Sequence, residues 1–282
     1  MRHLPAYKGI LLLLATTSFL DAGTLAQFRT PLGDIEVELY DKDKPITVQN
    51  FTRYVQSGAY QNEFSHRLLP GFVLQGGGFT MTNRGTTNAT ILAVPALGPI
   101  TNEFGVGRRF SNAYGTIAMA KLGGDTNSAT SQWFFNLANN SFLDAADTNN
   151  LFVVFGHVVR GTNVLNSFNR FQYFDGTQSS NLVYQGEPPP FDTLPLLHAS
   201  LADTSFVFID ITLLEVAVAS LPGGVRQVSW NSPVGMTNVV EFTTNLPPIW
   251  NTLVETNGSG NRISVNDPSL DAWRFYRVRV AY

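Results

Sequence analysis

Short apolar runs, alternating or continuous, dominate the sequence. In "GDIEVELY", Ile35, Val37 and Leu39 alternate with acidic residues, which predicts a half-buried strand. Further short runs follow at "EFSHRLL", "GFVLQGG", "GTIAMA", "SQWFFNL", "LFVVFGHVV" and "FVFIDITLLE". Turn-forming residues such as Gly, Asn, Ser and Asp separate most of them, so the pattern predicts a mainly β protein.

Two segments, residues 43–60 and 161–171, show the period of an amphipathic helix instead. The first places three apolar residues on one helical face: Val48, Phe51 and Val55. The second does so with Val164, Leu165 and Phe168. Many short strands with only two helices predict a closed antiparallel β-barrel with the helices over its open ends.

The pattern changes at "LPGG", residues 221–224, beyond which only strand-like runs occur. We expect this turn-rich stretch to be a linker. The tail should form a small β-sheet module packed on Trp230, Trp250 and Trp273. The predicted domains are a signal peptide at 1–23, a barrel at 24–216 and the β module at 217–282.

The N-terminus has the three parts of a secretory signal. Basic residues precede the apolar run "GILLLLATTSFL", and small residues follow it. We therefore expect a cleaved signal peptide and a mature chain that is exported to the periplasm or the extracellular space. An uncleaved N-terminal anchor is the alternative. No other stretch is long enough to span a membrane.

Composition excludes several classes of function. The net charge is −3 with no run of like charges, which argues against nucleic acid as a partner. The chain has no cysteine, so disulfides and thiolate metal sites are excluded. Its four histidines lack metal-ligand spacing. We predict neither a metal nor another cofactor.

The stretch "HRLLPGFVLQGGG", residues 66–78, holds Arg67 and Gln75 among apolar residues. One interpretation is a buried strand pair whose arginine reaches solvent and pairs with a surface carboxylate. The other is a reaction site with one fixed cation beside an apolar pocket. The glycines do not form a nucleotide-binding fingerprint, because no helix follows them.

Six separated blocks then carry a resemblance: "VQNF", "FSHRLLPGFVLQGGGF", "GTIAMA", "SATSQWFFNL", "SFLD" and "FVVFGHVVRGTNVL". In order and spacing they resemble the cyclophilins, the peptidyl-prolyl cis/trans isomerases, and most of all the bacterial exported branch. The resemblance covers about residues 24–216. It implies a cyclophilin-like barrel that isomerises X-Pro bonds without a cofactor, acting on proline-containing segments of exported proteins.

The resemblance also implies roles for individual residues. Arg67 would donate to the prolyl nitrogen of the twisted amide, and Gln75 would steady Arg67 and hydrogen-bond the substrate. The remaining site residues are expected to bind the substrate: His66, Phe72, Val73, Ala120, Lys121, Phe134, Leu143 and Phe152. Among them, Ala120 and Lys121 match the stretch whose backbone grips the residue before proline. For the single apolar residues, core packing is the alternative role.

Two rival functions remain open at this stage. The barrel could hold proline-containing segments without turnover, or the C-terminal module, whose partner is unknown, could act in a cell-surface interaction protein. The segment from Phe171 to Asp203 is longer than the family requires. Its proline run, Pro188-Pro189-Pro190, would either rim the active-site face or cross the end of the barrel.

Overall fold

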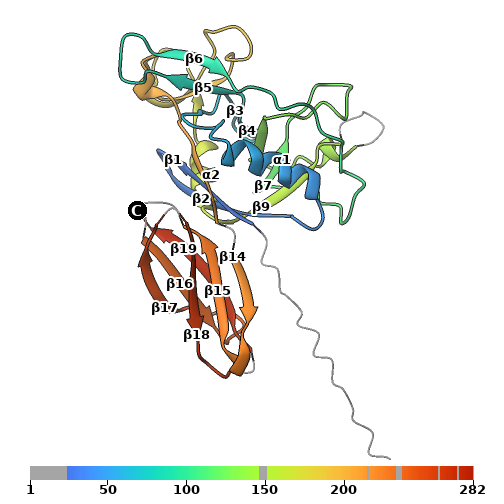
Figure 1. The fold of residues 1–282 in the computed structure, drawn as a ribbon. Helices are drawn as coiled ribbons and strands as arrows, with labels where there is room; N and C mark the ends of the chain where they lie inside the picture. Colours follow the sequence, from blue (N-terminus) through green and yellow to red (C-terminus); the bar gives the residue numbers. More distant parts are fainter. Residues whose placement is uncertain are drawn as a thin grey trace, which may run out of the picture.

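The computed structural model describes residues 24–145, 151–214, 216–232, 237–259, 261–271 and 273–281. The predicted signal peptide, residues 1–23, lies outside these ranges. The described part is mainly β, with two α-helices and three short 3-10 turns. Figure 1 shows the barrel strands with helix α1 in one body and strands β14–β19 in a second one.

The largest sheet has eight strands in the order β13-β1-β2-β9-β7-β8-β4-β3, and every neighbouring pair is antiparallel. Its strands are β1 (Leu25–Thr30), β2 (Gly33–Leu39), β3 (Arg67–Leu69), β4 (Val73–Gly76), β7 (Thr116–Met119), β8 (Trp133–Asn136), β9 (Val154–Arg160) and β13 (Asp210–Leu214). In β2, the alternating Ile35, Val37 and Leu39 are all buried, as predicted.

Backbone hydrogen bonds outside the named strands join the two ends of this sheet. The Ser65 N–H donates to the Val207 carbonyl at 2.9 Å, and the Ile209 N–H donates to the Glu63 carbonyl at 3.0 Å. These bonds link the segment before β3 to the segment before β13. The sheet therefore curls into the predicted cyclophilin-like barrel, and neither of these two ends is left as an open edge.

The barrel core is aromatic at its centre. The ring centroid of Phe28 lies 5.8 Å from that of Phe51, 5.1 Å from Trp133 and 5.0 Å from Phe135. The first pair is stacked and the other two are edge-to-face. Aromatic pairs in such geometries add about 0.5–1.5 kcal/mol to the gain from burial.

Helices α1 (Pro45–Gln56) and α2 (Thr162–Phe168) form where the helical period predicts them. The N-terminal end of α1 is held by the buried Glu103, whose carboxylate accepts the backbone N–H groups of Ile46 at 3.1 Å and Thr47 at 2.7 Å. An anionic acceptor at this end satisfies unpaired N–H groups and complements the helix dipole.

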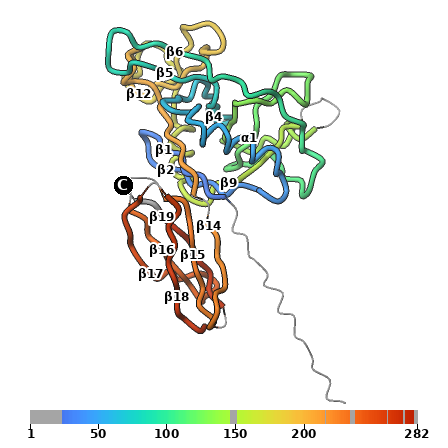
Figure 2. Tube along the Cα trace, viewed as in Figure 1, coloured from blue at the N-terminus to red at the C-terminus, as the bar shows by residue number. Residues whose placement is uncertain are grey.

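The segment from Phe171 to Asp203 forms its own three-stranded sheet beside a hairpin. The sheet consists of β10 (Gln172–Tyr173), β11 (Ser180–Tyr184) and β12 (Leu194–His198), and the hairpin of β5 (Phe79–Thr82) and β6 (Thr90–Ala93). The two share a separate apolar cluster: Phe64, Met81, Leu182, Leu194, Leu196 and Phe206. Figure 2 shows β12 close to β5 and β6. Two 3-10 turns also lie among these strands: η1 (Ser141–Asp144) between β8 and β9, and η2 (Asp203–Ser205) between β12 and β13.

The C-terminal strands form two three-stranded sheets around a common core. One sheet contains β14 (Val216–Ser220), β15 (Arg226–Asn231) and β18 (Arg262–Asp267); the other contains β17 (Asn251–Asn257), β16 (Thr237–Thr243) and β19 (Phe275–Ala281). Trp230 is fully buried between them and donates its indole N–H to the Asn238 side-chain oxygen at 3.0 Å. The other two tryptophans differ from prediction: Trp273 is 61% exposed, and Trp250 lies against the Arg277 guanidinium.

The interpretation of "LPGG" as a linker is also wrong. Strands β14 and β15 pair with each other in antiparallel register, from Val216 opposite Trp230 to Ser220 opposite Arg226. The 3-10 turn η3 (Pro222–Gly224) is therefore the turn of a hairpin inside the C-terminal module. Its Gly223 has φ 82°, which glycine adopts without strain. The chain passes from barrel to module between Leu214 and Val216, and the separation of 24–216 from 217–282 as domains stays a prediction.

One truncation tests this domain organisation. A mature chain ending at Leu214 keeps β13 and every other barrel strand, so we expect it to fold. It loses the C-terminal core that covers the buried Leu214. Exposing one leucine costs about 1.5–3 kcal/mol, which corresponds to a Tm about 3–12 °C lower. Thermal unfolding of the purified protein measures this shift.

A chain ending at Asp203 serves as the comparison, because it lacks β13 and the bonds that close the barrel. We expect it to be insoluble or unfolded. If the chain ending at Leu214 behaved in the same way, the C-terminal strands would be part of the isomerase fold and the two-domain prediction would be wrong.

Glu63 is fully buried beside the barrel closure. Burial raises the pKa of Glu63 well above its usual value of 4.5, while the Gly77 N–H acts in the opposite direction. The folded protein therefore keeps this proton up to a higher pH than the unfolded chain does. A native state that binds more protons than the unfolded chain loses stability as the pH rises.

We expect Glu63→Gln to be more stable than the parent protein at pH 8, because the amide has the same shape and does not ionise. The difference should shrink toward pH 4.5, where the carboxyl of the unfolded chain is also protonated. Urea unfolding at several pH values measures it, with Glu255→Gln on the exposed part of β17 as the control. A difference that does not change with pH would contradict this account.

Candidate active site

The hairpin β3–β4 sets the polar edge of the candidate site. Arg67 and Gln75 lie directly opposite each other across the two strands, so their side chains project from the same face. Arg67 Nη1 donates to Gln75 Oε1 at 3.2 Å. The turn between the strands contains Gly71 with φ 74°, a conformation that favours glycine. The two predicted catalytic residues are thus held together by strand register.

A second amide extends this edge. Gln75 Nε2 donates to Gln132 Oε1 at 2.7 Å, and Gln132 also hydrogen-bonds the imidazole of His66. Sequence reasoning missed Gln132. The available signal was its position directly before the buried strand β8, which pairs with the strand that carries Gln75.

Apolar side chains form the floor and wall beside this edge. Seven of the ten members of this cluster come from five separate segments of the chain: Phe72, Val73, Ala118, Ala120, Phe134, Leu143 and Phe152. Val73, Phe134 and Leu143 are nearly buried, whereas Phe72 and Phe152 are half-buried and can contact a ligand. The fold therefore brings together all the apolar residues predicted for the site.

Aromatic contacts connect the apolar and polar parts. The Arg67 guanidinium lies 6.0 Å from the Phe72 ring centroid, and Phe72 stacks on Phe142 at 5.7 Å. Phe134 meets Phe152 edge-to-face at 5.7 Å. A cation at the edge of an aromatic, water-poor surface is screened less than one in bulk water.

His66 lies behind the edge. It is 1% exposed and packs edge-to-face on Phe79 at 5.0 Å. Burial, followed by the charge of Arg67, lowers the pKa of His66 to about 4, although the hydrogen bond with Gln132 acts against this. The imidazole is therefore neutral at physiological pH and supports Gln132. A direct contact of His66 with substrate stays a prediction that its burial does not favour.

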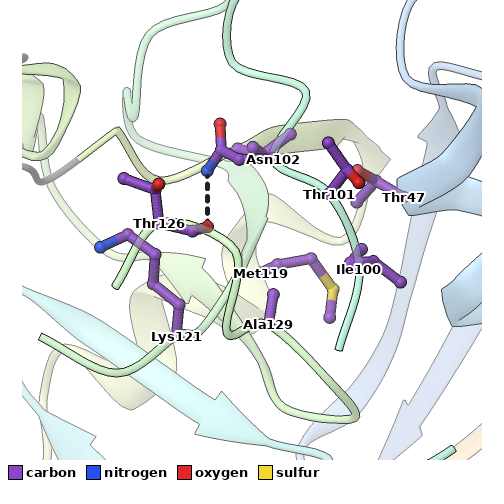
Figure 3. Close-up of a pocket in the computed structure, with 9 residues that line it drawn as sticks. Thr47, Ile100, Thr101, Asn102, Met119, Lys121, Thr126 and Ala129 are labelled. Carbon is purple, nitrogen blue, oxygen red and sulfur yellow. Dashed lines mark hydrogen bonds between the residues drawn. The ribbon is translucent and has the colours of Figure 1, made fainter. Parts of the chain in front are cut away.

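Lys121 lies on the opposite side of the apolar cluster. Its Nζ is 4.5 Å from the Phe152 ring centroid. Lys121 also lines a small cavity with Met119, Asn102 and Thr126, in which Asn102 donates to the Thr126 carbonyl at 3.1 Å (Figure 3). The cavity holds about 10 Å³, close to the least that admits one water molecule. It is too small for a proline ring.

No group of three or more His, Asp or Glu side chains within the described ranges is arranged to hold a metal ion. The polar groups at the edge of the site include one guanidinium and two amides, next to an apolar surface.

Comparison with known proteins identifies the family. The family model described as cyclophilin type peptidyl-prolyl cis-trans isomerase/CLD matches residues 25–185, more than half of the chain. A peptidyl-prolyl cis-trans isomerase of Acinetobacter baylyi is 42% identical over 144 residues, which are 51% of this chain and 71% of that protein. Peptidyl-prolyl cis-trans isomerase A of Dickeya dadantii is 40% identical over 56% of this chain and 75% of its own length. The chain therefore belongs to the family of cyclophilin-type peptidyl-prolyl cis-trans isomerases.

Proposed function

We propose that this chain isomerises X-Pro bonds by stabilising the twisted amide with Arg67, and that its substrates are exported proteins. The observation that carries the proposal is the Arg67–Gln75 hydrogen bond of 3.2 Å at the edge of an apolar cluster. The family relationship supports the reaction class.

The reaction requires one particular kind of stabilisation. Amide resonance creates a barrier of ~18–20 kcal/mol to rotation about the X-Pro bond. Twisting the bond removes the resonance and localises a lone pair on the prolyl nitrogen. A donor aimed at that nitrogen stabilises the twisted state more than either planar state, which is the condition for catalysis. No proton leaves the substrate and no covalent intermediate forms.

Arg67 meets this requirement because its charge is held in place without being neutralised. It donates a hydrogen bond to a neutral amide, that of Gln75. Burial lowers the pKa of Arg67, and the nearby Asp192 and Tyr173 act against this. A guanidinium stays protonated throughout the physiological range. The proline ring would lie on Phe72 and Phe134, with Leu143 closing the pocket.

The N-terminal sequence supports a location for the substrates outside the cytoplasm. Basic residues followed by an apolar run at the N-terminus are typical of export, so we propose that the mature chain acts on proteins after translocation. None of the helices in the described ranges is long and apolar enough to cross a membrane. The partner of the C-terminal module is not assigned.

Arg67→Ala tests the catalytic role. Loss of one preorganised donor lowers rates by about 10²–10³-fold, and we expect a loss of that size in kcat/KM for a proline peptide. Because Arg67 is half-buried and lies on β3, the last strand of the sheet, the thermal unfolding temperature should change little. Arg53→Ala, an exposed arginine on α1, is the matched control.

Binding measured on the same variant separates the enzyme from the rival function. If the protein only held proline-containing segments, the parent chain would bind the peptide without accelerating its isomerisation. A fall in kcat/KM of less than about tenfold in Arg67→Ala would remove Arg67 from the role assigned to it.

The mechanism also predicts the pH profile. His66, with a pKa of about 4, is neutral at the working pH and is not a general base. We expect kcat/KM to be flat between about pH 5.5 and 8.5, since no group has to donate or accept a proton. The contribution of His66 to stability, in contrast, should fall as the pH drops from 6.5 toward 4, because the unfolded chain protonates this histidine first. Because Glu63 acts in the opposite direction over this range, the fall is measured by urea unfolding of the Glu63→Gln protein. A sigmoid activity profile centred between about pH 6 and 7 would indicate a titrating base and contradict the mechanism.

A further inference from the structure

The segment from Phe171 to Asp203 adds to the edge of the site. Strand β3, which carries Arg67, is the last strand of the eight-stranded sheet. The Leu68 N–H donates to the Thr193 carbonyl at 2.8 Å, so residue 193 pairs with β3 on the side away from β4. The residue directly before it, Asp192, is therefore held beside β3, the strand that carries Arg67.

Aromatic packing keeps this segment in place. Phe191 lies 4.8 Å from the Phe79 ring, and Phe79 lies 5.0 Å from the His66 ring. Phe191 also packs on the fully buried Phe64 at 6.3 Å. Ring contacts thus connect Phe191 through Phe79 to His66, the residue before Arg67. A residue between two such anchors has little freedom to move its backbone.

Asp192 is the exposed residue between these anchors. Phe191 is half-buried and Thr193 is buried, while Asp192 faces solvent. Burial lowers the pKa of Arg67, and the negative charge of Asp192 and the phenol of Tyr173, which is 44% exposed, oppose this lowering. Among the described residues no ion pair joins Asp192 to Arg67. The Arg67 guanidinium donates a hydrogen bond to the Gln75 side-chain oxygen instead.

The segment from Phe171 to Asp203 is acidic. Residues 171–203 contain no lysine or arginine and four carboxylates: Asp175, Glu187, Asp192 and Asp203. A surface of this kind next to a cleft favours cationic ligands and disfavours anionic ones.

The sheet order gives the direction in which a substrate would reach this surface. The Ala120–Lys121 stretch, which is expected to grip the residue before proline, follows β7, and two strands, β8 and β4, separate β7 from β3. A peptide that crosses the apolar cluster from Lys121 toward Arg67 leaves the site over β3. The residues after proline therefore meet Asp192.

We propose that Asp192 and Tyr173 form a subsite that selects substrates with a lysine or arginine shortly after the proline. The carboxylate of Asp192 attracts the cation, and the Tyr173 ring offers an aromatic face to it. This inference rests on the proposed function, because it concerns the same cleft.

Three peptides that differ only at the second residue after proline, Lys, Gln or Glu, test the subsite on the full mature chain. An exposed ion pair contributes a small gain and a like-charge contact a similar loss. We therefore expect kcat/KM for the Lys peptide to exceed that for the Glu peptide by about fivefold at low salt. High salt should reduce this ratio, because it screens exposed charges.

Two variants assign the preference to one residue. The Lys-to-Glu ratio should fall to about one in Asp192→Asn and invert in Asp192→Lys. Asp175→Asn, which removes an exposed carboxylate from the same segment, is the control and should keep the ratio of the parent chain. Thermal unfolding of each variant verifies that it is folded.

Three other results would contradict the subsite, and they can be told apart. If the Gln peptide is turned over and the Lys and Glu peptides do not differ, the subsite is overturned and the proposed function stands. If Asp192→Asn lowers kcat/KM by one common factor for all three peptides, Asp192 acts by positioning Arg67, which also overturns the subsite. If the parent chain accelerates none of the peptides, both proposals fail.

Discussion

The closure of the barrel between residues 63–65 and 207–209 is the constraint on which the rest of the structure depends. Its two backbone hydrogen bonds join segments that are far apart in the chain. On one side they direct the chain into β3 and so place Arg67. On the other side they direct it into β13, which pairs with β1 and leads to the C-terminal sheets. One closure therefore positions both the polar edge of the site and the start of the second module.

The polar edge shows how a cation can be fixed next to an apolar surface and still be available. A buried carboxylate beside Arg67 would orient it but would also neutralise it. Gln75 and Gln132 orient it instead through neutral amides, and the neutral His66 supports them from below. Amides satisfy hydrogen bonds without adding charge. Asp192, in the segment from Phe171 to Asp203, is exposed to solvent and forms no ion pair with the Arg67 guanidinium among the described residues.

Much of the barrel could be predicted because its signals are local. Alternation in β2 and the helical faces of α1 and α2 follow from neighbours in sequence. The resemblance supplied the candidate residues on either side of the Pro70–Gly71 turn. Other features depend on tertiary contacts. A Pro-Gly-Gly stretch suits a hairpin turn as well as a linker, and Trp273 could not be distinguished from a core tryptophan by its type alone.

The role of Gln132 and the docking of the segment from Phe171 to Asp203 could not be predicted either, because both depend on tertiary contacts. An amide next to an aromatic strand has no periodic signal, and its role appears only when β8 lies beside β4. The docking of residue 193 on β3 depends on one backbone hydrogen bond and on rings from three separate segments. Neither propensity nor composition predicts such a contact.

The pairing of β1 with β13 has a consequence for how the chain acquires its fold. Leu25 lies opposite Leu214, so the first strand of the barrel obtains its second neighbour only from the last one. During synthesis, β1 can pair early with β2 but keeps one unpaired edge until residue 214 has emerged. Loop closure over such a separation makes folding slow, because chain entropy is lost before the contact forms. A protein that would shorten the folding of others thus has a slow final step of its own.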